Sequence, residues 1–151
     1  MEQAISAFNQ WFEDNGGTFH PSISIKDSPH GGLTVKVALD KPAIRPSELL
    51  VSCPSTLMIS YNNAVTSHVL RPLFPTFQSL PSGEVLITRF YIIEQYLLQS
   101  NSRWYPYIQL LPQPGDTSSP HSTTLFNQED IKWLANTNTG KATVYRLQQW
   151  R

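Results

Sequence analysis

Cysteine is nearly absent from this sequence. Cys53 is the only one, which excludes an internal disulfide and fits an intracellular protein, because structural disulfides are typical of exported proteins. We interpret Cys53, at the end of a predicted buried strand, as a small core residue. Four histidines are scattered along the chain, at His20, His30, His68 and His121. None has the cysteine or carboxylate spacing of a metal site, so we predict that the chain binds no metal.

An excess of charge of one sign is also missing. Eleven basic and eleven acidic residues give a formal net charge of zero. Without a general electrostatic field, or a basic stripe with interleaved aromatic residues, we expect no nucleic-acid partner. The first residues, MEQAISAFNQWFEDNGG, carry acids where a signal peptide needs a basic start, and no apolar run approaches membrane-spanning length. We expect no membrane partner and an intracellular location, cytoplasmic or nuclear.

Recognisable catalytic motifs are lacking as well. The sequence has no nucleophile elbow and no glycine-rich phosphate loop, so the catalytic residues, if any, stay unknown. Glu94 is the carboxylate with the most interesting position, because it lies within an apolar helical pattern. It is either a side chain at the helix edge that reaches water or Arg89, or a buried functional acid. We favour the first interpretation, because Glu94 falls opposite the predicted apolar stripe.

Apolar residues, in contrast, are concentrated between Glu84 and Pro112. One set recurs at helical spacing and predicts an α-helix with one apolar face: Leu86, Phe90, Ile93 and Leu97. Further apolar residues broaden this face, so we expect the helix to be largely buried. A second group begins at Trp104, with Pro106 suited to the first turn of a short helix. We therefore predict two helices that meet at a sharp corner, with Trp104 in the corner.

The remaining pattern predicts an α+β fold, in which a small antiparallel β-sheet packs against a cluster of helices in a single domain, residues 1–151. We expect strands at Ser22–Lys26, Leu33–Leu39, Glu48–Cys53 and Leu57–Ser60, the third of them buried on both faces. Helices are expected at Glu2–Asp14, Tyr61–Arg71, Asn127–Asn136 and Lys141–Arg151. Residues 72–83 and 113–127 read as connections. In the third of these helices, Asn127 should be the cap, and Trp133 and Leu134 should face inward.

A family resemblance rests on three segments of the sequence. The first sixty residues contain, in this order, a strand, the turn HGGL, a second strand, a proline loop and the segment ELLVSCPSTLMIS. The other two segments come later in the chain and are ITRFYIIEQYLLQSNSRWYPYIQLLPQP and IKWLANTNTGKA. Together they resemble the SET domain of the branch that is similar to Rubisco large-subunit methyltransferase, with fungal proteins as the closest pattern. In this resemblance, residues 1–60 are the opening of the SET domain and residues 61–151 are similar to the helical insertion.

The resemblance implies a protein-lysine methyltransferase that uses S-adenosylmethionine. It places cofactor contacts at Gly31, Gly32 and Leu33. The asparagine–histidine pair and the catalytic tyrosine of the family would lie beyond the last residue, so we expect a truncated SET domain that does not methylate lysine by itself. No cofactor is then expected for this chain alone, and S-adenosylmethionine is expected if the family activity is retained.

Two hypotheses from different classes follow. In one, the chain is an incomplete methyltransferase or pseudoenzyme that binds a protein partner. In the other, it is a repurposed fungal protein that binds an apolar small molecule and could promote its cyclisation by positioning it. The residues predicted to line the substrate site are Phe90, Trp104, Tyr105 and Tyr107. The apolar stripe of the last helix, which includes Trp150, also makes a homo-oligomer a possible assembly.

Overall fold

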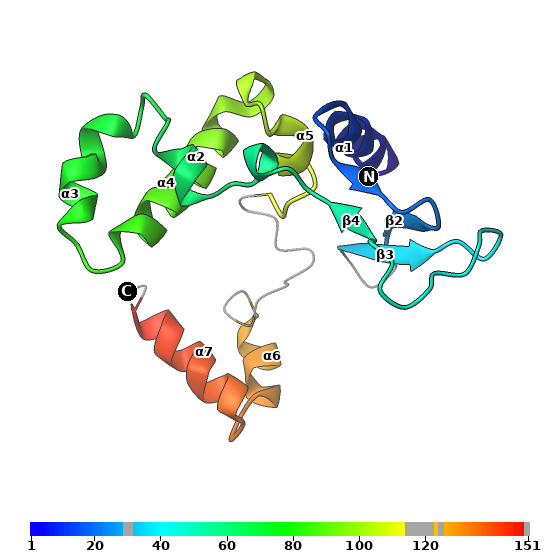
Figure 1. Cartoon of the computed structure of the whole chain (residues 1–151). Coiled ribbons are helices and arrows are strands. Elements are labelled where there is room, and N and C mark those ends of the chain that lie inside the picture. Colours follow the sequence, from blue (N-terminus) through cyan, green and yellow to red (C-terminus); the bar gives the residue numbers. More distant parts are fainter. Residues whose placement is uncertain (29–31, 114–122, 124–125, 150–151) are drawn as a thin grey trace. The chain divides into compact units, whose positions relative to one another are not determined.

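A computed structural model describes residues 1–28, 32–113, 123 and 126–149 (Figure 1). The chain divides into two compact units, Met1–Pro112 and Gln113–Arg151, which are described separately. The assignment of all 151 residues to one SET-like domain stays a prediction. The strands are β1 (Thr18–Phe19), β2 (Ile23–Asp27), β3 (Leu33–Val37) and β4 (Val51–Ser52). The α-helices of the first unit are α1 (Glu2–Asp14), α2 (Tyr61–Ala64), α3 (Phe74–Gln78), α4 (Gly83–Leu98) and α5 (Tyr105–Ile108). Short 3-10 turns stand at Ser55–Leu57, Arg71–Leu73 and Gln99–Asn101.

The N-terminal helix α1 has the predicted bounds. Its apolar face buries Ile5 and Phe12, while the helix leaves its polar side exposed. Gly16 then takes a left-handed conformation at φ +86°, which a residue with a side chain adopts only at a cost. The chain can therefore turn directly from α1 into β1.

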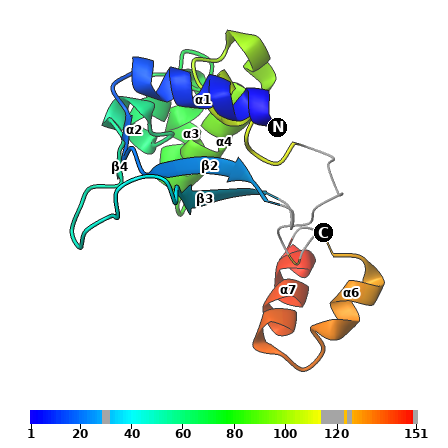
Figure 2. The ribbon, with the colours of Figure 1, turned by 90° about the vertical axis from the view of Figure 1, so that its right-hand side faces the viewer.

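The α+β class is confirmed, but the strands form two separate sheets and not one. β2 pairs antiparallel with β3 from Ile23↔Val37 to Asp27↔Leu33, and β1 pairs antiparallel with β4 over two residues. Figure 2 shows α1 beside the β2–β3 hairpin. The β1 strand was not predicted, because two residues are too few to show an alternating pattern.

Two strand predictions are wrong. The third predicted strand, Glu48–Cys53, is reduced to the two residues of β4, and its apolar run is exposed: Leu49 by 70% and Leu50 by 43%. Among the described strands β4 pairs only with β1, so an apolar run alone was no measure of burial. The fourth, Leu57–Ser60, is replaced by the 3-10 turn Ser55–Leu57, since the fixed φ of Pro54 favours the start of a helical turn.

The predicted helix Tyr61–Arg71 is shorter than expected, and the predicted connection after it contains a helix. α2 ends at Ala64, and the next helical turn begins at Arg71. α3 begins at Phe74 with a proline in its first turn, where the missing N–H has no helical partner in any case. Prolines that were expected to break helices therefore begin them here.

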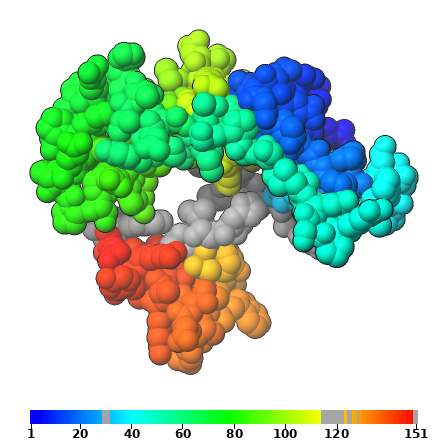
Figure 3. Space-filling model, viewed as in Figure 1, coloured from blue at the N-terminus to red at the C-terminus, as the bar shows by residue number. Residues whose placement is uncertain are grey.

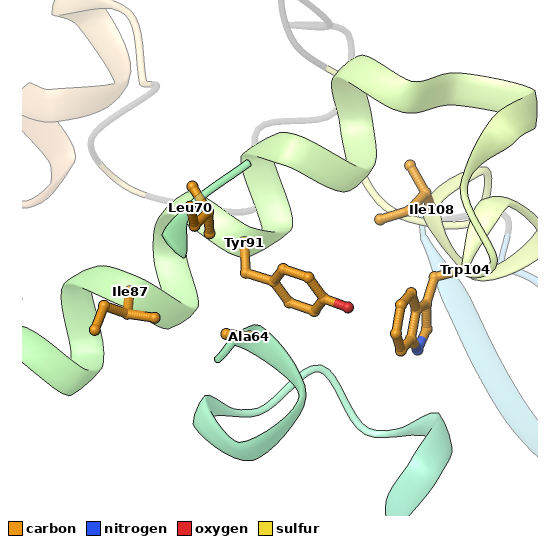
Figure 4. Close-up of a cluster of buried hydrophobic side chains, with 6 residues drawn as sticks. All are labelled: Ala64, Leu70, Ile87, Tyr91, Trp104 and Ile108. Carbon is orange, nitrogen blue, oxygen red and sulfur yellow. The ribbon is translucent and has the colours of Figure 1, made fainter. Parts of the chain in front are cut away.

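The core of the first unit lies along α4, on a face different from the predicted one. Ile87, Tyr91 and Gln95 are buried, whereas Phe90, Ile93 and Leu97 are 41, 50 and 79% exposed. Because α4 is apolar on most sides, the helices that pack on it decide which face is buried. The buried cluster comprises Ala64, Leu70, Ile87, Tyr91, Trp104 and Ile108 (Figure 4). The expectation of a largely buried helix is thus corrected to one buried face.

The predicted corner between two helices is confirmed. α4 is followed by a 3-10 turn and then by α5, with Pro106 in the first turn of α5. Trp104 stands at the start of α5, is 6% exposed, and donates a hydrogen bond from Nε1 to the Leu57 carbonyl oxygen at 2.9 Å. Its ring meets that of Tyr91 edge-on, with 5.5 Å between ring centroids. Trp104 thereby connects the corner to the segment after β4.

In the second unit, α6 (Gln128–Trp133) and α7 (Asn138–Gln149) follow each other closely. The Asn127 cap is confirmed, because its Oδ1 accepts from the backbone N–H groups of Glu129 and Asp130 at 2.9 and 2.8 Å. The inward position of Trp133 is wrong, since this side chain is 85% exposed. α7 begins three residues before the predicted start, where Thr137 Oγ1 accepts from the Gly140 N–H and helps to satisfy the first turn. Trp150 lies outside the described residues.

Candidate functional site

The predicted cofactor turn connects β2 and β3. Gly32 has φ +74° and its carbonyl oxygen accepts a hydrogen bond from the Ser28 N–H at 2.9 Å. Leu33 follows as the first residue of β3 and pairs with Asp27. A glycine in this conformation lets a ligand approach the backbone closely, which fits the predicted role of Gly32. Gly31 lies outside the described residues.

The four residues predicted to bind substrate lie in different surroundings. Trp104 is part of the buried cluster, and its ring nitrogen already has a partner. Phe90 lies on the exposed side of α4, where its ring packs against Phe77 with 5.0 Å between centroids. Tyr105 is half-buried at the start of α5. Tyr107 is half-buried in α5 and lines a pocket.

Tyr107 lines an apolar cavity of about 330 Å³, which we call the aromatic pocket. α1 contributes Phe8, Trp11 and Phe12 to it, and the segment after β4 contributes Cys53, Leu57, Met58 and Ile59. In the space-filling view of Figure 3 the blue residues of α1 lie beside the blue-green residues of that segment. The walls are mostly carbon, so the pocket favours an apolar group.

Phe8 is central to the aromatic pocket. Its ring centroid lies 5.7 Å from that of Phe12, 5.8 Å from that of Trp11 and 6.2 Å from that of Tyr107. Their spacing in the sequence places Phe8, Trp11 and Phe12 on one face of α1. The signal for a pocket was present in the excess of large rings, three within five residues, which a short neighbouring segment cannot cover completely.

The polar groups nearest to the core have mostly structural partners. Ser67 Oγ donates to Glu94 Oε2 at 2.7 Å, so Glu94 is an edge residue with a serine partner and not one that reaches Arg89. Burial raises the pKa of Tyr91, the charge of Glu94 raises it further, and Arg103 opposes both. Burial also raises the pKa of Tyr96, whose hydroxyl donates to the Pro112 carbonyl oxygen at 3.1 Å. These contacts hold helices together and offer no evident catalytic group.

The described residues offer neither a cluster of metal ligands nor a membrane-spanning helix. They contain no group of three or more histidine, cysteine, aspartate or glutamate side chains that could hold a metal ion. None of the helices described combines the length and the apolar character needed to cross a membrane.

Comparison with curated proteins gives significant relatives. The chain is 33% identical over 141 residues to the ribosomal lysine N-methyltransferase set10 of Schizosaccharomyces pombe, covering 91% of this chain and 24% of that protein. It is 26% identical over 128 residues to the actin-histidine N-methyltransferases of Xenopus tropicalis and Callithrix jacchus, covering 85% of this chain and 20% of each relative. The chain is homologous to protein N-methyltransferases of the SET type.

The match has a limited extent. The chain spans about a quarter of the length of the first of these relatives and a fifth of the others. No family model matches the chain. No solved structure shows significant similarity to it either. The homology therefore supports a methyltransferase-like ancestry, in which S-adenosylmethionine is the cofactor of the family.

Proposed function

We propose that these 151 residues contribute one side of the cofactor site of a SET-type protein N-methyltransferase, and that methyl transfer needs residues beyond them. The observation that carries the proposal is the 33% identity to a ribosomal lysine N-methyltransferase over 91% of the chain. The left-handed Gly32 at the end of the β2–β3 turn supports it, because this position lets S-adenosylmethionine approach the backbone at Gly32 and Leu33.

The second half of the proposal rests on how methyl transfer works. S-adenosylmethionine supplies an electrophilic methyl group, and the acceptor nitrogen must be neutral, in line with that methyl group and shielded from water. The aromatic pocket is lined by Tyr107 but by neither Gly32 nor Leu33. The turn and the aromatic residues thus supply separate parts of such a site. The acceptor we propose is a protein side-chain nitrogen of lysine or histidine, the two kinds named for the relatives.

Calorimetry with S-adenosylmethionine and the purified chain tests the cofactor part. We expect weak binding, which Gly32→Val abolishes because a β-branched residue resists φ +74°. Gly16→Val is the matched control, since it imposes the same backbone strain at φ +86° away from the turn and should leave binding intact. Melting curves of both variants establish that they fold. Equal binding by the Gly32 variant and the unchanged chain would contradict the proposed contact.

Methyl-transfer assays test the other part. With radiolabelled S-adenosylmethionine and ribosomal proteins or actin as acceptors, the purified chain should transfer no label. Transfer above the level of a protein-free control would show that these residues suffice for catalysis.

A second candidate function is favoured by the aromatic pocket. Its volume of about 330 Å³ lies at the lower end of the range for small-molecule sites, roughly 300–1,000 Å³. A repurposed protein would bind an apolar molecule there, and a cyclase would act by positioning it, with the few polar groups of the wall on Tyr107, Trp11 and Cys53. On this hypothesis calorimetry with S-adenosylmethionine gives no heat, whereas naphthalene binds in the aromatic pocket and Phe8→Ala weakens its binding.

A further inference from the structure

A second pocket, of about 290 Å³, lies between α1 and the strands. We call it the Asn9 pocket. The residues that matter for its chemistry are Asn9 and Glu13 of α1, His20 after β1, Ile23 and Ile25 of β2, and Val35 of β3. Figure 2 shows the arrangement of α1 and the β2–β3 hairpin that encloses it. Neither the cofactor turn nor the predicted substrate residues line this pocket.

Asn9 is the unusual residue of the pocket. Its Oδ1 atom is buried and has no hydrogen-bond partner in the described part of the chain, and no other side-chain atom there is in this condition. A buried carbonyl oxygen without a partner is destabilising, so such atoms are rare and often mark a position where a ligand or a water molecule binds. Asn9 Oδ1 can only accept a hydrogen bond. A ligand that satisfies it must bring a donor.

The other polar groups of the pocket indicate which kind of hydrogen-bond donor the ligand carries. Glu13 follows Asn9 by one helical turn, so both side chains lie on the same side of α1. The Glu13 carboxylate forms no ion pair within the described residues. His20 is already engaged, because its Nδ1 accepts from the Ser22 N–H at 3.1 Å and its Nε2 lies 3.5 Å from Glu48 Oε2. Asn9 Oδ1 and the Glu13 carboxylate are therefore two free acceptors, one of them negatively charged, and the Ser24 hydroxyl at the wall can donate or accept.

The rest of the wall is largely apolar, and the volume suits one extended side chain better than a nucleotide-sized group. Ile23 and Ile25 are half-buried, and Val35 is 62% exposed, which leaves aliphatic surface for a hydrocarbon stem. A lysine side chain combines such a stem with a compact head that has three donors.

We propose that the Asn9 pocket binds a primary alkylammonium group, with the hydrocarbon stem against Ile23, Ile25 and Val35. The head donates to Asn9 Oδ1 and is balanced by the Glu13 carboxylate. Its source is either a lysine side chain of a protein partner or a free alkylamine. The proposal does not depend on methyl transfer.

The test is an amide- and methyl-detected NMR titration of the 151-residue chain at about pH 8, where imidazole is ordinarily neutral. The probes are Nα-acetyl-lysine N-methylamide and n-butylammonium chloride, with Nα-acetyl-norleucine N-methylamide as the uncharged analogue. We expect saturable shifts at the Asn9 side-chain amide and the Ile23, Ile25 and Val35 methyl groups with a cationic probe only. Saturation by the lysine probe favours a protein source, and saturation by butylammonium alone favours a free amine. Equal shifts with the norleucine probe, or none with either cation, would overturn the proposal.

Variants of Asn9 and Glu13 distinguish an effect on ligand binding from an effect on folding. Asn9→Leu should weaken binding by about tenfold or more, because the head loses its buried acceptor, and should raise the melting temperature because no unpaired oxygen remains. Glu13→Gln should weaken binding by only about two- to threefold, since an exposed carboxylate acts in a high dielectric. Glu2→Gln removes the same charge from the far end of α1 and should change nothing. Unchanged binding by Asn9→Leu, or a lower melting temperature of that variant, would contradict the assignment.

Discussion

The helices around α4 and the region of strands β2, β3 and β4 contain similar aliphatic residues but bury them to different extents. Ile87, Leu70 and Ile108 are at most 4% exposed in the helical core. In the strand region Leu49 is 70% exposed, and Leu39 on the loop after β3 is fully exposed. Both regions are rich in aliphatic residues, so composition does not explain the difference. What differs is the supply of partners within the described chain.

The helical core has partners on several sides. α2, α3 and α5 all pack against α4, and Trp104 connects this group to Leu57 through its ring nitrogen. Each two-stranded sheet, in contrast, has one hydrogen-bonded neighbour per strand. A sheet of two strands is marginal by itself and gains stability when something covers its apolar face. The stability of the first unit should therefore reside mainly in the helices.

The largest effect is expected for Ile87→Ala, which removes a fully buried side chain from α4. It should lower the free energy of unfolding by about 2–5 kcal/mol, the usual range for such a cavity. Ile93→Ala is the matched control on the same helix, because Ile93 is 50% exposed and should cost less than about 1 kcal/mol. Urea denaturation measures both. Equal losses of the size expected for Ile87 would mean that α4 buries the face predicted from the sequence as well as the one observed.

Trp104→Phe should have the next largest effect, about 1–3 kcal/mol, since it leaves the buried Leu57 carbonyl oxygen without its donor. Tyr107→Phe, one helical turn away and half-buried, is the comparison and should cost little. The midpoints of urea denaturation, followed by far-ultraviolet circular dichroism, measure the difference in stability between the two variants. A neutral Trp104→Phe would remove the link between the helical core and the segment after β4.

Alkaline pH offers a smaller effect confined to the helical core. Because the pKa of Tyr91 is raised in the folded state, the protonated hydroxyl is favoured by folding. This contribution is complete below the unfolded pKa of 10.0 and is lost as the pH rises beyond it through the higher folded pKa. The free energy of unfolding should therefore fall above that pH, and it should fall less steeply in the Tyr91→Phe variant. Identical slopes for the two proteins in thermal melts at a series of pH values would exclude Tyr91 as the cause.

The smallest effect should come from the strand region. Leu49→Ser replaces an exposed leucine before β4, and its effect on the free energy of unfolding should be within about 0.5 kcal/mol, as for other surface positions. The midpoint of urea denaturation measures it. A loss similar to that of Ile87→Ala would show that the Leu49 side chain is buried in solution, and the contrast between the two regions would disappear.

Local signals in the sequence were sufficient for several features. The bounds of α1, the Asn127 cap and the corner at Trp104 all follow from residues within one or two helical turns. Features that depend on distant partners did not follow. Which side of α4 is buried is decided by Ala64 and Trp104, and the exposure of Leu49 depends on what packs beside β4.

The candidate site shows the same limit. The turn at Gly32 was predicted from a family resemblance, and its left-handed backbone fits that role. Of the predicted substrate residues, Tyr107 lines the aromatic pocket and the other three do not, because they were chosen as large aromatic residues and not by their partners. The unpaired oxygen of Asn9 could not be recognised from the sequence, since an asparagine on a helix is ordinarily exposed.

The proposed role at the cofactor turn is tested most directly by an amide-resolved NMR titration of the chain with S-adenosylmethionine. Shift changes centred on the backbone N–H groups of Gly32 and Leu33, and lost in Gly32→Val, are the predicted result. Shift changes centred on Phe8 and Tyr107 with the turn unaffected, or no changes at all, would contradict it.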